Sequence, residues 1–325
     1  MTAQIRRDDA RVGQTLREPP EAEAGARDPM ERNDRPAGAR AMLVHVEPHP
    51  AIMGQRRMAG RWRVGLLDGK KAIVMGVGNQ RSIAWGIATA FQREGAELAF
   101  NYAADRLKDN VDKLVVTLPG HERMAVLPCD VTKQDEIDAF FEQIGDRWGS
   151  ADILVHSIAF AAVEDLRGRF HEISRDGLKL AIEVSAFSLI ALTRAALPLF
   201  EKAGGGSVLS LTYNAVDRVV PSYNSMAMAK AVLEAETRYL AADLGPMNIR
   251  VNTISAGPLK TLAGSAVKGI SSARDLMTEK APLRRNITQD EVGNVAVFLA
   301  SELSRCVTGA TIFADNGFNV LGVAD

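Results

Sequence analysis

The sequence has little of several features that mark specialised classes of protein. Its 325 residues include two cysteines, Cys129 and Cys306, too few for a disulfide framework and without the spacing of a metal site. Lys and Arg number 39 against 40 Asp and Glu, so charge gives no reason to expect nucleic acid or an anionic membrane as a partner. The most apolar run, residues 184–193, is uncharged for ten residues, whereas a membrane span needs about 20. These absences favour a cytoplasmic globular protein with reduced thiols and no bound metal.

Residues 1–63 differ from everything that follows them. They are rich in Arg, Asp, Glu, Pro and Gly and lack sustained apolar periodicity, so they cannot bury enough surface to offset chain entropy. They contain no apolar core of a secretory signal, and their scattered acidic residues argue against a transit peptide. We expect a disordered extension, or residues mis-assigned before a true start at Met53 or Met58; a regulatory tail is the alternative. Residues 64–325 are expected to form one domain.

From residue 66 onward, short apolar runs alternate with amphipathic stretches. Strands are expected at 71–76, 97–102, 124–128, 153–156, 207–212, 249–254 and 311–314. Helices are expected at 83–94, 104–115, 133–147, 176–200, 223–244 and 289–299. Strands that are apolar on both faces and joined by helical crossovers indicate a parallel sheet covered on both sides. The pattern therefore predicts an α/β protein with a doubly wound Rossmann fold and a seven-stranded parallel sheet.

The first predicted strand ends in a glycine turn at Gly76 and Gly78. Glycines let the chain turn tightly and approach a pyrophosphate, which would lie over backbone N–H groups at the start of the next helix. The next glycine is Gly86, so the spacing is not G-x-G-x-x-G and an ordinary glycine turn is the alternative. Its place between the first strand and the first helix favours a dinucleotide site.

The ends of later strands carry further candidates. Asp130 ends the third strand, where a short carboxylate can meet an adenine edge. Asp105 and Arg106 lie a few residues beyond the second strand, so these residues do not decide between NAD and NADP. His156 ends the apolar fourth strand, and we interpret it as structural.

Tyr223 and Lys230 are seven positions apart in the predicted helix 223–244. They therefore share a helix face, roughly 10 Å apart along the axis. A phenol there could donate a hydrogen bond to a reacting oxygen, while the ammonium holds a cofactor ribose and lowers the pKa of the phenol. Taken alone, the pair could equally be two unrelated surface residues. The dinucleotide features upstream favour the catalytic interpretation.

These segments in this order resemble the short-chain dehydrogenase/reductase superfamily over residues 66–318. More narrowly, they resemble its divergent branch, the bacterial enoyl-acyl-carrier-protein reductases. The spacing Tyr223-x₆-Lys230 is the most specific sign, because ordinary members separate the two residues by three, and position 227 is Ala here. Tyr213, ten residues before Tyr223, also matches. Supporting runs are Arg81-Ser82-Ile83-Ala84-Trp85-Gly86, Ile254-Ser255-Ala256-Gly257-Pro258 and Pro282-Leu283-Arg284-Arg285.

The resemblance implies a role for each matching residue. Tyr223, Lys230 and Tyr213 would be catalytic, with Tyr213 shaping the acyl pocket or, alternatively, serving as a core aromatic. The acyl substrate would contact Ala161, Tyr213 and Tyr223. The cofactor would contact Gly76, Ser82, Ile83, Ala103, Asp130, Val131, Ile158, Lys230, Leu259, Thr261, Leu262 and Ala263. Residues 259–281 would form a mobile lid. The family commonly has Gln at the position of Ala103 and a second Gly at that of Asn316.

The resemblance further implies reduction of the trans-2 double bond of enoyl thioesters on acyl carrier protein, in type II fatty acid biosynthesis. NADH would be the hydride donor, with NADPH as an alternative, and the protein a homotetramer packed through helices such as 176–200 and 223–244. A relative acting on a 3-ketoacyl thioester or an alcohol would show Tyr-x₃-Lys and an upstream catalytic Ser. A silent dinucleotide-binding scaffold would have lost Tyr223 or Lys230.

Overall fold

The computed structural model describes residues 65–261 and 270–322, which form a sheet of seven parallel strands. The order is β3-β2-β1-β4-β5-β6-β7, so the direction of winding reverses between β1 and β4. The strands are β1 (Lys71–Met75), β2 (Glu97–Tyr102), β3 (Ala125–Pro128), β4 (Ile153–His156), β5 (Gly206–Thr212), β6 (Ile249–Ala256) and β7 (Thr311–Ala314). The predicted doubly wound fold is confirmed, and β2, β4 and β7 have the predicted limits.

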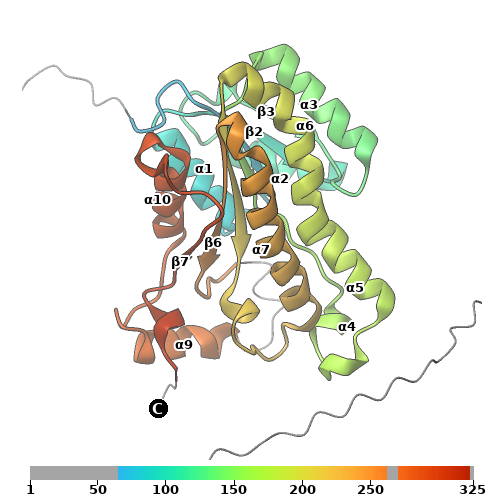
Figure 1. The fold of residues 1–325 in the computed structure, drawn as a ribbon, viewed down its shortest axis with the longest axis vertical. Coiled ribbons are helices and arrows are strands. Elements are labelled where there is room, and N and C mark those ends of the chain that lie inside the picture. Colours follow the sequence, from blue (N-terminus) through green and yellow to red (C-terminus); the bar gives the residue numbers. More distant parts are fainter. Residues whose placement is uncertain (1–64, 262–269, 323–325) are drawn as a thin grey trace, which may run out of the picture. The chain divides into compact units, whose positions relative to one another are not determined.

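Helices cover both faces of the sheet (Figure 1). One face packs against α1 (Ile83–Arg93), α2 (Asp105–Val115) and α10 (Gln289–Ala300). The other packs against α3 (Gln134–Trp148), α6 (Ser188–Ala203) and α7 (Asn224–Leu244). The interiors of β1, β4 and β5 are buried, so their apolar runs supply both cores at once. The edge strands β3 and β7 are less completely buried.

The helix pair α1 and α10 packs at unusually close range. A Cβ atom on Gly293 of α10 would lie 2.7 Å from the carbonyl oxygen of Gly86 in α1, and one on Gly86 would lie 2.7 Å from Cβ of Gln289. Gly86 therefore serves helix packing, while the turn before α1 contains Gly76 and Gly78.

The long helix predicted at 176–200 is interrupted. It consists of α5 (Arg175–Ile182), a π-helical turn η3 (Glu183–Phe187) and α6. Among the described residues, this combined helix, Arg175–Ala203, is long and apolar enough by length and composition to cross a membrane. Half of its most apolar 18-residue stretch is buried within the protein, as expected of a core helix packed against a sheet.

Shorter elements complete the described chain. They are α4 (Val163–Leu166), α9 (Ile270–Lys280) and the 3₁₀ turns η1 (His121–Arg123), η2 (Phe170–Glu172), η4 (Asn214–Val216), η5 (Gly245–Met247), η6 (Glu302–Ser304) and η7 (Phe318–Val320). Figure 1 shows α4 and α9 at its lower end, where α7 begins.

Within the segment 259–281, where a mobile lid was predicted, residues 270–280 form α9, a helix that the sequence did not predict. Met277 and Ala281 are fully buried in the core cluster that includes α1 and α10. This burial stabilises a helix whose own sequence has little apolar periodicity. Residues 1–63, Leu262 and Ala263 lie outside the described residues, so what was predicted for them stays a prediction.

Candidate active site

The loops that follow β1 and β4 meet at the winding reversal, where doubly wound sheets generally form a ligand-binding crevice. Gly76 has φ +91°, and a Cβ atom there would lie 2.2 Å from the carbonyl oxygen of Ser157 and 3.2 Å from Cγ1 of Ile158. Only glycine fits this conformation and this contact. The structure thus brings together the predicted cofactor residues Gly76 and Ile158 at the position where doubly wound sheets bind nucleotides.

Ser82 ends the glycine turn as the N-cap of α1. Its hydroxyl donates to the carbonyl oxygen of Asn79 at 2.7 Å and accepts from the backbone N–H of Trp85 at 3.3 Å. Its own carbonyl accepts from the Gln289 side chain of α10 at 2.7 Å. Ile83 is the first residue of α1 and half-buried. These bonds fix the N-terminus of α1 at the crevice, where its partial positive charge favours an anion.

Asn101 is a site residue that we did not predict from the sequence. Its side-chain oxygen accepts from the backbone N–H of Gly76 at 2.9 Å, and its side-chain nitrogen donates to the carbonyl oxygen of Cys129 at 3.0 Å. It therefore ties together the ends of β1, β2 and β3. The signal in the sequence is a polar residue near the end of an otherwise apolar strand, and in the structure Asn101 is 4 % exposed.

The predicted adenosine residues lie at the ends of β2 and β3. Asp130 is half-buried, and its Oδ1 accepts from the backbone N–H of Thr132 at 3.1 Å and from its hydroxyl at 2.8 Å. Val131 is buried, whereas Ala103 is exposed just after β2. Since β2 and β3 are paired neighbours, the structure brings these three residues to one end of the sheet.

Tyr223, Tyr213 and Lys230 come together where β5 ends and α7 begins. Tyr223 is the N-cap residue of α7, directly before its first turn, and Tyr213 directly precedes η4. The two tyrosine rings lie 5.2 Å apart between centroids, tilted by 58°. Lys230 is 5 % exposed, and its Nζ donates to the carbonyl oxygen of Leu211 at 2.7 Å. Tyr213 and Tyr223 are therefore in contact, and Lys230 is bound to the strand two residues before Tyr213.

Burial sets the charge of these groups. It raises the pKa of Tyr223, as does the neighbouring Tyr213, and burial raises the pKa of Tyr213 as well. Both phenols are thus protonated at neutral pH and able to donate hydrogen bonds. Burial lowers the pKa of Lys230 to about 8. The expectation of a lowered pKa for Tyr223 is not met, because burial and then Tyr213 raise it.

An apolar wall lies beside Tyr223. Ala161 and Tyr223 pack against one small cluster of buried side chains, formed by Leu166, Ala181, Met226 and Ala229. The cluster joins α4, α5 and α7. The predicted substrate residue Ala161 and the predicted catalytic residue Tyr223 therefore share one apolar cluster.

His156 has the structural role that the sequence indicated. It is fully buried, and its Nε2 donates to the hydroxyl of Ser188 at 2.7 Å, because that hydroxyl itself donates to the carbonyl oxygen of Val184. Burial and the charge of Lys230 lower the pKa of His156 to about 3. The ring is therefore neutral, and it links β4 to the first residue of α6.

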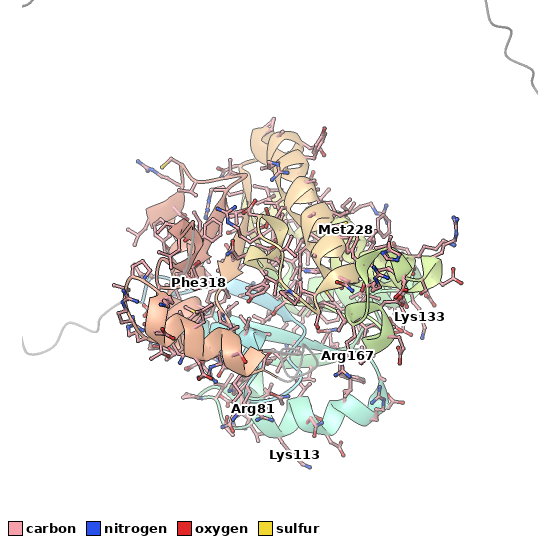
Figure 2. The ribbon with its side chains drawn as sticks, turned by 90° about the horizontal axis from the view of Figure 1, so that it is seen from below. Arg81, Lys113, Lys133, Arg167, Met228 and Phe318 are labelled. Carbon is pink, nitrogen blue, oxygen red and sulfur yellow. The ribbon has the colours of Figure 1, made fainter. Side chains whose placement is uncertain are left out.

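The segment 257–261 follows the carboxyl end of β6. Leu259 is 9 % exposed and belongs to the core cluster of α1 and α10. The backbone N–H of Thr261 donates to the carbonyl oxygen of Leu259 at 2.9 Å. Figure 2 shows the molecule from below, with Arg81, Arg167, Met228 and Phe318 labelled on four separate segments.

Asn316 lies in a tight turn after β7. Its φ of +57° is in the left-handed region, which explains why a relative would have glycine there and why asparagine is tolerated. The side chain donates to the carbonyl oxygen of Arg285 at 2.7 Å. The same turn lines a pocket of about 470 Å³ between the end of β7, the segment 282–287 and α10, and no predicted site residue borders this pocket.

Comparison with known proteins agrees with this geometry. Residues 76–319 match the family model described as Enoyl-(Acyl carrier protein) reductase. The NADH-dependent enoyl-[acyl-carrier-protein] reductase FabI of Bacillus cereus is 51% identical over 257 residues, which cover 79% of this chain and 99% of that protein. FabI of Aquifex aeolicus is 44% identical over 260 residues, which cover 80% and 95%.

A solved structure gives the same result. The crystal structure of the Bacillus cereus enoyl-acyl carrier protein reductase with NADP⁺ and indole naphthyridinone has a TM-score of 0.78 to this chain at 51% identity. The match covers 80% of this chain and all of that one. The chain therefore belongs to the enoyl-(acyl carrier protein) reductase family.

Proposed function

We propose that this chain is an NADH-dependent enoyl-[acyl-carrier-protein] reductase, which reduces the trans-2 double bond of enoyl thioesters in type II fatty acid biosynthesis in the cytoplasm. The observation that carries the proposal is the cluster of Tyr223, Tyr213 and Lys230. Its phenols lie 5.2 Å apart between ring centroids, beside a buried ammonium. The relatives from Bacillus cereus and Aquifex aeolicus bear this activity in their names.

The residues of the crevice fit a dinucleotide. Gly76 offers backbone without a side chain where the β1 and β4 loops touch, and the capped N-terminus of α1 favours phosphate charge. Lys230 uses one of its three N–H donors on Leu211, which leaves donors for a ribose. Asp130 and Val131 would hold the adenine, with Ile158 at the adjacent ribose and Leu259 at the carboxamide. When bound, the nicotinamide supplies the hydride that adds to the β-carbon of the substrate.

The residues of this chain would stabilise the negative charge that develops on the thioester oxygen. Tyr223 stays protonated because burial raises its pKa, so it can donate a hydrogen bond to that oxygen throughout the neutral range. Lys230 adds a nearby positive charge. Tyr213 and the apolar cluster beside Ala161 would shape the acyl pocket, and solvent would deliver the proton to C2.

The spacing of Tyr223 and Lys230 favours an enoyl substrate over a ketoacyl one. In a conjugated thioester the carbonyl oxygen lies two carbons from the carbon that accepts hydride. A ketone reductase needs its phenol beside the accepting carbon itself.

The experiment follows NADH and NADPH absorbance with a trans-2-enoyl thioester and a 3-ketoacyl thioester on acyl carrier protein, side by side. We expect reduction of the enoyl substrate, faster with NADH. Reduction of the ketoacyl substrate alone would contradict the proposal.

We also infer a homotetramer. Leu180 of α5, Phe187 of η3 and Tyr239 of α7 are large apolar or aromatic side chains that are 36 %, 48 % and 81 % exposed. Helices α5 and α7 are in contact, and apolar side chains exposed on neighbouring elements favour burial against other copies of the chain.

A further inference from the structure

The Lys230 ammonium lies at the end of β5, in a buried environment that disfavours its protonated form. Nζ is bound to the carbonyl oxygen of Leu211 at 2.7 Å, and the side chain is 5 % exposed. Burial alone favours the neutral amine. If Lys230 is to bind a ribose and stabilise negative charge, a second group must help to keep it protonated.

Glu234 lies one helical turn after Lys230 on α7, on the same side of the helix. Its Oε1 accepts a hydrogen bond from the hydroxyl of Thr212 at 2.8 Å. Thr212 is 5 % exposed and directly follows Leu211 in β5. Consecutive residues of one strand therefore anchor the ammonium and the carboxylate, and the two opposite charges are fixed in a partly buried environment.

We infer that Glu234 is a positioning residue for Lys230: its carboxylate, anchored by Thr212, keeps the neighbouring ammonium charged and directed at the end of β5. The inference rests on the proposed role of Lys230 in holding the cofactor. Glu234 itself touches neither substrate nor cofactor in this scheme.

The ionisable groups nearby on β4, β5 and the start of α7 carry no negative charge that could keep Lys230 protonated. His156 of β4 is neutral at physiological pH, and the two phenols, Tyr213 and Tyr223, are protonated. The charge of Glu234 raises the pKa of Lys230 against the effect of burial, and Lys230 in turn lowers that of Glu234. Burial raises the pKa of Glu234, and the hydrogen bond from Thr212 lowers it. Asp217, after η4, raises it further, and Arg238 of α7 lowers it.

The test measures NADH affinity by fluorescence from pH 6 to 9.5 for the full chain and its Glu234→Gln variant. The affinity of the unchanged protein should fall as pH rises through the pKa of Lys230, about 8. Removing an opposite charge lowers that pKa, by about one unit. Glu234→Gln should therefore bind NADH about five-fold more weakly than the unchanged protein at pH 8, and equally well at pH 6.

Two further variants separate charge from structure. Glu234→Asp keeps the charge. Its NADH affinity should therefore fall at high pH, the alkaline limb of the curve, within a few tenths of a pH unit of where that of the unchanged protein falls. Asp243→Asn removes an exposed carboxylate from the same helix, roughly 20 Å from Lys230 along the axis, and should leave the curve in place. kcat/KM for NADH in the enoyl assay should show the same shifts, since it reports groups of the free enzyme.

Three results would overturn the inference: a Glu234→Gln curve that superimposes on that of the unchanged protein, affinity reduced by one factor at every pH, or no alkaline limb in the unchanged protein. The last two outcomes indicate a merely structural Glu234 or an uninvolved Lys230. Failure of the proposed function looks different, because the unchanged protein would then bind NADH with this pH dependence and not reduce the enoyl thioester.

Discussion

At the scale of single residues, the role of each group in the site depends on whether it is protonated. Tyr223 is a phenol whose raised pKa keeps it a hydrogen-bond donor, and Lys230 is an ammonium whose pKa of about 8 lies close to physiological pH. His156, fully buried at the end of β4, is neutral. One positive charge beside protonated phenols is an arrangement that stabilises a developing oxyanion.

Tyr223→Phe removes the phenol hydroxyl and keeps the ring. We expect kcat for the enoyl thioester to fall by about 10²–10³, the usual cost of one oxyanion donor, with the NADH dissociation constant changed by less than about two-fold because Lys230 is retained. Steady-state kinetics and NADH fluorescence titration measure both. Tyr239→Phe, the same change roughly 24 Å further along α7, is the control, since it keeps the apolar ring at the inferred interface. Unchanged turnover of Tyr223→Phe would remove Tyr223 from its role.

Residue types and spacing predicted the Tyr223–Lys230 pair, but not the charge states around it. Desolvation depends on which atoms cover a group, and the sequence does not reveal this. The tilted contact of Tyr213 with Tyr223 likewise joins segments on two elements. Asn101 was missed for a related reason: an asparagine in a strand is a weak signal until the ends of β1 and β3 are seen on either side of it.

At the scale of elements, the crevice depends on contact between the β1 and β4 loops. Gly76→Ala would put Cβ 2.2 Å from the carbonyl oxygen of Ser157 at a φ of +91°, so one loop must move. We expect the free energy of unfolding to fall by about 3 kcal/mol, seen as a lower thermal midpoint, together with weaker NADH binding.

Gly78→Ala is the matched control for Gly76→Ala. It lies in the same turn, and a Cβ atom there would meet nothing within 4 Å. Its midpoint should stay near that of the unchanged protein. Equal midpoints for the two variants would contradict the close contact.

The alternation of apolar runs and amphipathic stretches predicted all seven strands and the main helices, because a doubly covered parallel sheet imposes that pattern. It did not predict α9, where Met277 is buried against distant segments. The π-helical turn was missed as well, since the sequence of 183–187 carries no signal that separates it from an α-helix.

At the scale of the whole molecule, exposed apolar side chains on α5, η3 and α7 support the inferred assembly. Phe187→Asp places a charge among them and should shift the protein to a smaller species in size-exclusion chromatography with light scattering, since burying an unpaired carboxylate is costly. Val116→Asp, at an exposed apolar residue after α2 that is 57 % exposed, should leave the mass unchanged. A tetramer that survives Phe187→Asp would exclude this surface as the interface.

The π-helical turn sets a phase difference along the helix from residue 175 to residue 203. One additional residue rotates everything after it by about 100° relative to an uninterrupted α-helix. Helix α5 contacts α7, whereas α6 contacts both α3 and α7. The turn also places Ser185 on both backbone groups of Phe160 and Ser188 under His156. Through the two bonds of Ser185 to Phe160, the π-helical turn fixes the loop that leads to Ala161 against the helix that runs from residue 175 to residue 203.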